Sequence, residues 1–81
     1  MERTEIIKKV TLIFRKVLNS ESLIITEELS ADDVEHWDSL SHMLIINEVE
    51  NAFSIKFKLK ELNKMRNIGD MIDIIMLKMQ E

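Results

Sequence analysis

The sequence contains no cysteine and no proline, and Gly69 is its single glycine. Without cysteine the chain has no disulfide, no thiolate metal site and no cysteine nucleophile. Its fold therefore depends on packing alone, which is compatible with a reducing cytosol. Scarce glycine and proline disfavour the tight turns of hairpins and sandwiches. Together these absences predict an all-α fold.

The sequence also lacks a long apolar run and a basic excess. No stretch reaches the roughly 20 apolar residues that span a bilayer, and the N-terminal segment MERTEIIKKV lacks the apolar core of a signal peptide. A net charge of −4 disfavours nucleic acid as a partner and permits partners with basic surfaces. We expect one cytoplasmic, monomeric domain over residues 1–81, without a membrane span.

The spacing of apolar residues predicts three longer helices and one short helix, packed as a small four-helix bundle. We expect the first helix to run from Thr4, its N-cap, to Leu18, with Asn19 and Ser20 ending it. The apolar residues of this helix recur at helical spacing and should face the core: Ile6, Val10, Ile13, Phe14 and Val17.

The second helix is predicted to begin at Asp38 or Ser39 and to end at Phe53. Its apolar residues step by three and four and are expected to form one buried stripe: Leu40, Met43, Ile46, Val49 and Phe53. Leu44 falls on the flank that should face outward near Ser39.

An extended connector over residues 54–58 should lead to a brief third helix, Leu59–Met65. The last helix is expected to open with a capping box made by Asn67 and Asp70. Its core-facing residues are predicted to be Ile68, Met71, Ile72, Ile75 and Met79.

Residues 19–38 show no sustained helical or strand period and predict a long ordered loop with at most one short helical turn. A loop of this length in a small domain is typically either functional or a sign that an element has been misassigned. Its apolar residues should pin it to the bundle: Ile24, Ile25, Leu29 and Val34. Trp37 is interpreted as an anchor for the end of this loop rather than a ligand-stacking residue.

Asp38, Ser39 and His42 together suggest a serine nucleophile, but a hydrolase also needs an oriented base, an oxyanion hole and a cleft. A chain this small offers little material for them, so we expect no catalysis and a solvated or half-buried His42. The histidines and acids lack the spacing of a metal site, and we expect no structural metal.

A basic cluster follows the second helix and is made of Lys56, Lys58, Lys60, Lys64 and Arg66. It is either a solvated face or a secondary partner patch.

Ser39 stands at the positive end of a predicted helix, after an acidic loop. A phosphate ester there would be stabilised by free backbone N–H groups and by the helix dipole. This position predicts that Ser39 is an acceptor modified by another protein.

Four short motifs lie in order along nearly the whole chain: Asp33-Val34, Asp38-Ser39-Leu40, Glu50 with Phe53-Ser54-Ile55, and Ile68-Gly69-Asp70-Met71. In this combination the sequence resembles the acyl carrier proteins and peptidyl carrier domains. The resemblance implies that Ser39 carries a 4′-phosphopantetheine arm, attached from coenzyme A by a phosphopantetheinyl transferase. It also implies that Asp38 assists attachment by helping to hold the transferase's magnesium ion, and that the arm's thiol carries acyl or aminoacyl groups as thioesters.

Partner enzymes that load and transfer those groups are expected to contact the second helix. The expected contact residues are Leu40, Met43, Leu44, Glu48 and Glu50. Further acidic charge on this face would come from Asp32, Asp33, Glu35 and Asp38, which would steer the carrier to basic enzyme patches.

The sequence departs from the fatty-acid type of carrier at several positions. Trp37 replaces a small residue, Ser41 and His42 stand where acidic residues are common, and Leu44 stands where a partner-facing glutamate is often found. Trp-Asp-Ser-Leu is more similar to stand-alone carriers of polyketide, nonribosomal peptide or cell-surface modification pathways. Because Met1 lies just before the first helix and Glu81 just after the last, we expect a free-standing protein. The alternative is an unmodified helical adaptor that binds a partner through the second-helix face.

Overall fold

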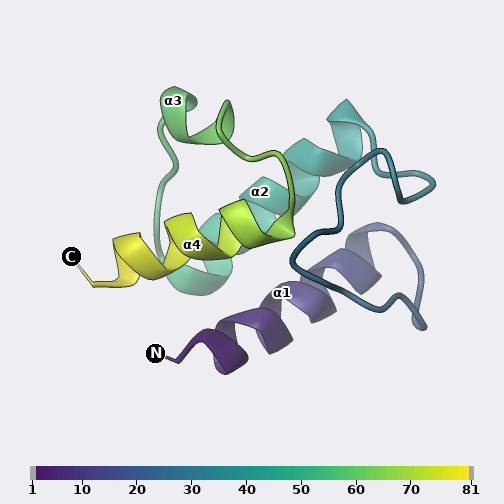
Figure 1. Ribbon diagram of the computed structural model, residues 1–81, viewed down its shortest axis with the longest axis horizontal. Helices are drawn as coiled ribbons and strands as arrows, with labels where there is room; N and C mark the ends of the chain where they lie inside the picture. Colours follow the sequence, from purple (N-terminus) through teal and green to yellow (C-terminus); the bar gives the residue numbers. More distant parts are fainter. Residues whose placement is uncertain (1, 81) are drawn as a thin grey trace.

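The computed structural model describes residues 2–80 and consists of helices α1 (Arg3–Val17), α2 (Ser39–Phe53), α3 (Leu59–Leu62) and α4 (Ile68–Met79). α1 packs against both α2 and α4, and α3 lies on the connection between α2 and α4 (Figure 1). Residues 2–80 contain no strand. The predicted all-α fold of three longer helices and one short helix is confirmed.

One hydrophobic core fills the space between the three longer helices. Its fully buried side chains come from all three: Ile6, Val10 and Phe14 on α1, Ile45 and Val49 on α2, and Ile68, Met71, Ile72 and Ile75 on α4. The predicted stripes of α1 and α4 are therefore confirmed, with Val17 and Met79 only partly buried at their edges.

The N-cap of α1 lies two residues before the predicted one. The N-cap is Glu2, not Thr4, and it makes no side-chain capping bond. Instead, the Arg3 guanidinium pairs with Glu27 at 2.6 Å and with Asp73 at 2.8 Å. These pairs tie the first turn to the loop and to α4, which the local sequence of the helix could not indicate.

The last helical residue of α1 is Val17, with Leu18 as the C-cap, and Asn19 and Ser20 terminate the helix as predicted. Asn19 takes a left-handed conformation (φ 53°), and the Ser20 N–H donates to the Arg15 carbonyl at 2.9 Å. This is the Schellman arrangement, in which a residue with positive φ satisfies the last free carbonyls of a helix.

The buried face of α2 is rotated from the predicted stripe. Leu40 and Met43 were expected in the core but are 73% and 54% exposed, whereas Ile45 is fully buried. The inward face runs through the half-buried His42 and then Ile45, Ile46, Val49 and Phe53. The reason is that Trp37 from the loop is buried against Phe14 and His42 at the start of α2 and takes the core space there. Leu44 faces outward as predicted and is 51% exposed.

The third helix is shorter than predicted, because it ends at Leu62 with Asn63 as its C-cap. The chain must then turn so that the half-buried Met65 reaches the core edge before α4 begins. The connector over residues 54–58 is confirmed, but it opens with Ser54 in a left-handed conformation (φ 55°) as the C-cap of α2. Its two apolar residues, Ile55 and Phe57, pack against the core.

The capping box predicted for α4 is only half present. The Asn67 side chain accepts from the Asp70 N–H at 2.9 Å, as expected. The Asp70 carboxylate does not return to Asn67; it accepts from the Arg66 N–H at 3.0 Å.

The long loop, residues 18–38, lies at the end of the bundle where α1 ends and α2 begins, opposite the end at which α1 starts and α4 finishes (Figure 1). It is irregular and held by partly buried apolar residues: Leu23, Ile25, Leu29 and Val34. Ile24, predicted among these anchors, is 75% exposed, and Leu23 takes its place with a carbonyl that accepts from Arg15 Nε at 2.8 Å.

The loop also caps α4. The Ile68 N–H donates to the Leu29 carbonyl at 3.0 Å, and the Gly69 N–H donates to the Glu27 carbonyl at 2.8 Å. Two of the free N–H groups at the start of α4 are thus satisfied by the loop.

Replacing Gly69 by alanine tests this docking. An added Cβ would lie 3.1 Å from the Glu27 carbonyl oxygen and 3.2 Å from Glu27 Cβ. Alanine favours a helix by roughly 0.5–1 kcal/mol over glycine, but the atoms that must move here are loop backbone held by the Gly69 bond. We therefore expect a lower melting temperature and faster amide exchange at Ile68. An increase in melting temperature would show that the loop backbone at Glu27 moves to accept the added methyl group without a loss of stability.

Candidate functional site

Ser39 is the first residue of α2, and its neighbours carry out the capping that a serine there usually performs. The Asp38 side chain accepts from the Ser41 N–H at 2.9 Å, and the Ser41 hydroxyl oxygen accepts from the Asp38 N–H at 2.8 Å. This is a complete capping box. Ser39 is exposed, and within residues 2–80 its hydroxyl has no hydrogen-bond partner. The hydroxyl is thus free for an external partner.

The turn before α2 sets the direction of these side chains. His36 takes a left-handed conformation (φ 72°), and its carbonyl accepts from the Ser41 hydroxyl at 2.8 Å. A positive φ in a residue other than glycine is uncommon and often marks a functional turn. Beyond this turn Trp37 is buried, while Asp38 and Ser39 are exposed.

Trp37 anchors the loop, as predicted. It is 7% exposed and meets Phe14 edge-on, with ring centroids 4.9 Å apart and planes at 88°. Its Nε1–H donates to His42 Nδ1 at 3.1 Å, so the indole's polar atom is satisfied.

His42 is half-buried, as expected, and serves Trp37 rather than Ser39. Its Nδ1 accepts the hydrogen bond from the indole N–H. Burial lowers the pKa of the imidazole below its ordinary value. Within residues 2–80 no hydrogen bond joins His42 to Ser39. The geometry that a serine hydrolase would need is not formed by this pair.

The Trp37–His42 bond predicts a pH-dependent fluorescence change. Protonation at His42 Nδ1 removes the acceptor, so neutral His42 is the form that the fold favours. Because the folded pKa is lowered, this contribution to stability is full above the unfolded value of about 6.5 and is lost as pH falls through the folded pKa. The other charged side chains lining the groove at His42 are Asp38 and Arg66.

Since Trp37 is the single tryptophan, its fluorescence reports the bond directly. We expect a transition with a midpoint below about 6.5 that disappears in His42→Gln. A midpoint above that value, or the same transition in His42→Gln, would contradict this assignment.

Asp38 is exposed and ionised. Hydrogen bonds from the Ser41 backbone and then the Ser41 side chain hold the pKa of its carboxyl below the usual range. Within residues 2–80 no group of three or more histidine, aspartate or glutamate side chains is placed to hold a metal ion.

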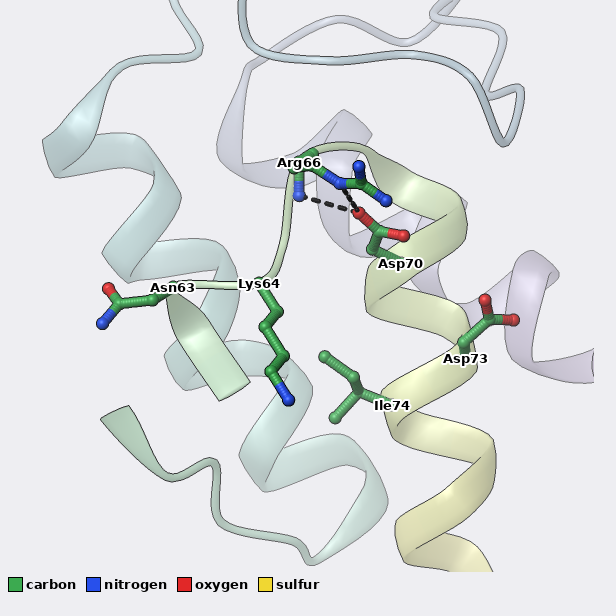
Figure 2. A pocket seen from close by; sticks show the side chains of 6 residues that line it. All are labelled: Asn63, Lys64, Arg66, Asp70, Asp73 and Ile74. Carbon is green, nitrogen blue, oxygen red and sulfur yellow. Dashed lines mark hydrogen bonds and ion pairs between the residues drawn. The ribbon is translucent and has the colours of Figure 1, made fainter. Parts of the chain in front are cut away.

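A groove beside Ser39 joins segments that are distant in the sequence. It is lined by Ala31, Trp37, Asp38, Ser39, His42, Met65 and Arg66. A second groove begins at Arg66 and runs along α4, lined by Asn63, Lys64, Arg66, Asp70, Asp73 and Ile74 (Figure 2). The sequence could have revealed Ser41 as the third-position partner of a capping box. It placed Arg66 only in a basic cluster and gave no signal for Met65; the fold brings both residues to the groove that Ser39 also lines.

The comparison with solved structures decides the family. The holo acyl carrier protein from Geobacter metallireducens, solved by solution NMR, superposes with a TM-score of 0.85 at 44% sequence identity, covering 90% of this chain and 84% of that one. The chain belongs to the acyl carrier protein family. A scan against protein-family models and a search of curated proteins give no match.

In this acyl carrier protein the apolar residues predicted to contact partners follow Ser39 in the first two turns of α2. Leu40, Met43 and Leu44 are 73%, 54% and 51% exposed. Large apolar side chains that lie close together and are this exposed to solvent are suited to protein contacts.

The two glutamates predicted for the same role are engaged within the chain. Glu48 pairs with Lys16 Nζ at 2.8 Å. Glu50 accepts from the Phe57 N–H at 2.9 Å, with its side chain 16% exposed. That Glu48 and Glu50 contact partner enzymes stays a prediction. The three exposed apolar residues are better placed for such contacts than Glu50, which is mostly buried and hydrogen-bonded within the chain.

No helix among residues 2–80 has both the length and the apolar character needed to cross a bilayer.

Proposed function

We propose that this acyl carrier protein carries acyl or aminoacyl groups as thioesters on a 4′-phosphopantetheine arm attached to Ser39. The observation that carries the proposal is the Ser39 hydroxyl, exposed at the head of α2 and released from capping by Asp38 and Ser41. In the attachment step Ser39 Oγ attacks the phosphorus that bears the pantetheine in coenzyme A. A P–O bond forms to Ser39, 3′,5′-adenosine bisphosphate leaves, and the hydroxyl proton goes to solvent or to a base of the transferase.

The residues present fit such a group. An exposed hydroxyl without an internal partner is accessible to a phosphopantetheinyl transferase, and the groove beside it gives the arm a surface to lie on. When bound, the arm supplies the thiol that a chain without cysteine lacks. The chain itself exposes the serine at the head of α2, buries the nearby Trp37 in the core and caps the first turn through Asp38 and Ser41.

Partner enzymes would recognise the surface around Ser39. Leu40, Met43 and Leu44 offer apolar contact area next to the attachment point. The loop adds exposed acids, Asp32, Asp33 and Glu35, that would steer the carrier to basic patches. The enzymes are the transferase and those that load and transfer acyl or aminoacyl groups in a fatty-acid-like, polyketide, nonribosomal peptide or cell-surface modification pathway.

Intact mass after incubation with coenzyme A, magnesium and a broad-specificity transferase tests the proposal. We expect a gain of one phosphopantetheine in the wild type, no gain in Ser39→Ala, and a full gain in the matched control Ser22→Ala on the exposed loop. No gain in the wild type would favour an unmodified adaptor that binds through the apolar face of α2.

Asp38→Asn separates the two roles of Asp38. Asparagine caps a helix about as well as aspartate, and its Oδ1 can still accept from the Ser41 N–H. We expect an unchanged thermal melt and a much slower attachment rate, because the negative charge offered to the transferase's magnesium is lost. An unchanged attachment rate would remove Asp38 from the attachment chemistry.

A further inference from the structure

The basic cluster after α2 has no role in the proposed function. Residues 56–66 contain five of the chain's eleven positive side chains and one of its fifteen acids, Glu61. The five cations are all exposed: Lys56, Lys58, Lys60, Lys64 and Arg66. Because the whole chain has a net charge of −4, this cluster locally reverses the sign of the protein's charge.

The connector and α3 have an inner side that contacts the bundle and an outer side that faces solvent. Phe57 and Leu62 are partly buried and pack against the core. In extended backbone successive side chains point to opposite sides, so Lys56 and Lys58 point away from the core on either side of Phe57. α3 itself has no fully buried residue and lies at the edge of the bundle, outside the three longer helices (Figure 1).

A large apolar side chain lies among the outward-facing lysines. Leu59 is 73% exposed and stands between Lys58 and Lys60 in the sequence. Within residues 2–80 neither of these two lysines forms an ion pair. We call Lys56, Lys58, Leu59 and Lys60 the outer basic surface.

The acids beside the outer basic surface are engaged in bonds inside the protein. Glu61 accepts from the Lys58 N–H at 2.7 Å and pairs with Lys78 of α4 at 2.9 Å. Glu50 accepts from a backbone N–H of the connector at 2.9 Å and lies 4.0 Å from the Nζ of Lys56, which is 85% exposed. The positive charge of this surface is therefore available to an external anion.

The residue types of this surface suit a membrane better than a protein interface. Protein interfaces are depleted in lysine and enriched in arginine and aromatic residues, and the outer basic surface has three lysines and neither of the enriched types. Anionic lipid head groups attract lysines without a fixed bonding geometry. A leucine beside them can enter the boundary between head groups and acyl chains.

We propose that the outer basic surface docks on a membrane that contains anionic lipids. Lys56, Lys58 and Lys60 contact the head groups, and Leu59 inserts between them. The position of α3 at the edge of the bundle leaves this surface open to a flat lipid layer (Figure 1). The inference goes beyond the proposed function and does not depend on the modification of Ser39.

Flotation with lipid vesicles tests the inference on the full chain. We expect the wild type to float with vesicles of phosphatidylglycerol and phosphatidylcholine in equal parts, to stay in solution with phosphatidylcholine alone, and to be released by high salt. The double variant Leu59→Gln, Lys60→Gln should lose most of the bound fraction. The matched control Leu12→Gln, Lys8→Gln removes one exposed leucine and one exposed lysine from α1 and should bind like the wild type. Thermal melts confirm that each variant is folded.

The other outcomes would overturn the inference. A wild type that does not float with the anionic vesicles, or that floats equally with phosphatidylcholine alone, would refute docking on anionic lipid. Equal losses in the two double variants would refute its assignment to the outer basic surface. Loss of transfer to the pathway enzyme in Leu59→Gln, Lys60→Gln, without vesicle binding by the wild type, would make this surface a protein contact instead. Ser39→Ala should float like the wild type, so a failure of the proposed modification would leave this inference standing.

Discussion

Replacing Trp37 by alanine is expected to lower the free energy of unfolding by about 3–5 kcal/mol. The side chain is 7% exposed, packs edge-on against Phe14 and donates to His42, so its removal leaves a cavity and an unpaired imidazole. A domain stabilised by about 0.05–0.15 kcal/mol per residue would lose a large part of its stability.

Urea unfolding followed by circular dichroism measures this effect, because the variant lacks the tryptophan needed for fluorescence. Trp37→Phe is the matched control, since it keeps a ring against Phe14 and removes the indole donor. We expect Trp37→Phe to unfold at a urea concentration between those of the wild type and Trp37→Ala. A Trp37→Ala midpoint equal to the wild type would contradict the role of Trp37 as the anchor of the loop.

The neighbouring residues Leu44 and Ile45 should respond in opposite ways to the same substitution. Ile45→Glu places a carboxylate at a fully buried position and is expected to unfold the domain, because an unpaired buried charge costs several kcal/mol or more. Leu44→Glu changes a half-exposed position and should alter stability by no more than about 0.5 kcal/mol.

The functional effects of the pair separate packing from recognition. We expect Leu44→Glu to accept the arm at the normal rate and to lose transfer to its own pathway enzyme, measured as kcat/KM. Thermal melting of both variants gives the control. A sharply lowered melting temperature in Leu44→Glu would place Leu44 in the core, and unchanged transfer would remove it from the partner surface.

The elements that could be predicted from the sequence are those fixed by local signals. Helical spacing located α1, α2 and α4, and Asn19 and Asp38 marked boundaries through their own backbone and side-chain preferences. Trp37 could be assigned to the core because one large aromatic residue at the end of an irregular loop has few other stable environments.

The features that could not be predicted depend on residues far apart in the chain. Leu40 and Met43 fit the helical period of a core stripe, but the buried face turns toward His42 because Trp37 fills the space beneath it. Thr4 resembles an N-cap, yet Arg3 starts the helix through pairs with Glu27 and Asp73. Periodicity reports which residues share a face and not what lies opposite that face.

The residues of the candidate site also separate into those with a local sequence signal and those that only the fold brings together. Ser39 and Asp38 stand out through position and motif, and Ser41 through its spacing in the capping box. The sequence placed Arg66 only in a basic cluster that is either a solvated face or a partner patch, and it did not link this residue to Ser39. Only the fold places it in the groove with Ser39.

Peptide mapping of the protein isolated from cells in which its pathway is active tests the central claim most directly. Fragmentation should place phosphopantetheine on Ser39, with part of the arm's thiol carrying an acyl or aminoacyl group that hydroxylamine removes. An unmodified Ser39 in protein from those cells, or an arm found instead on Ser41, would contradict the account.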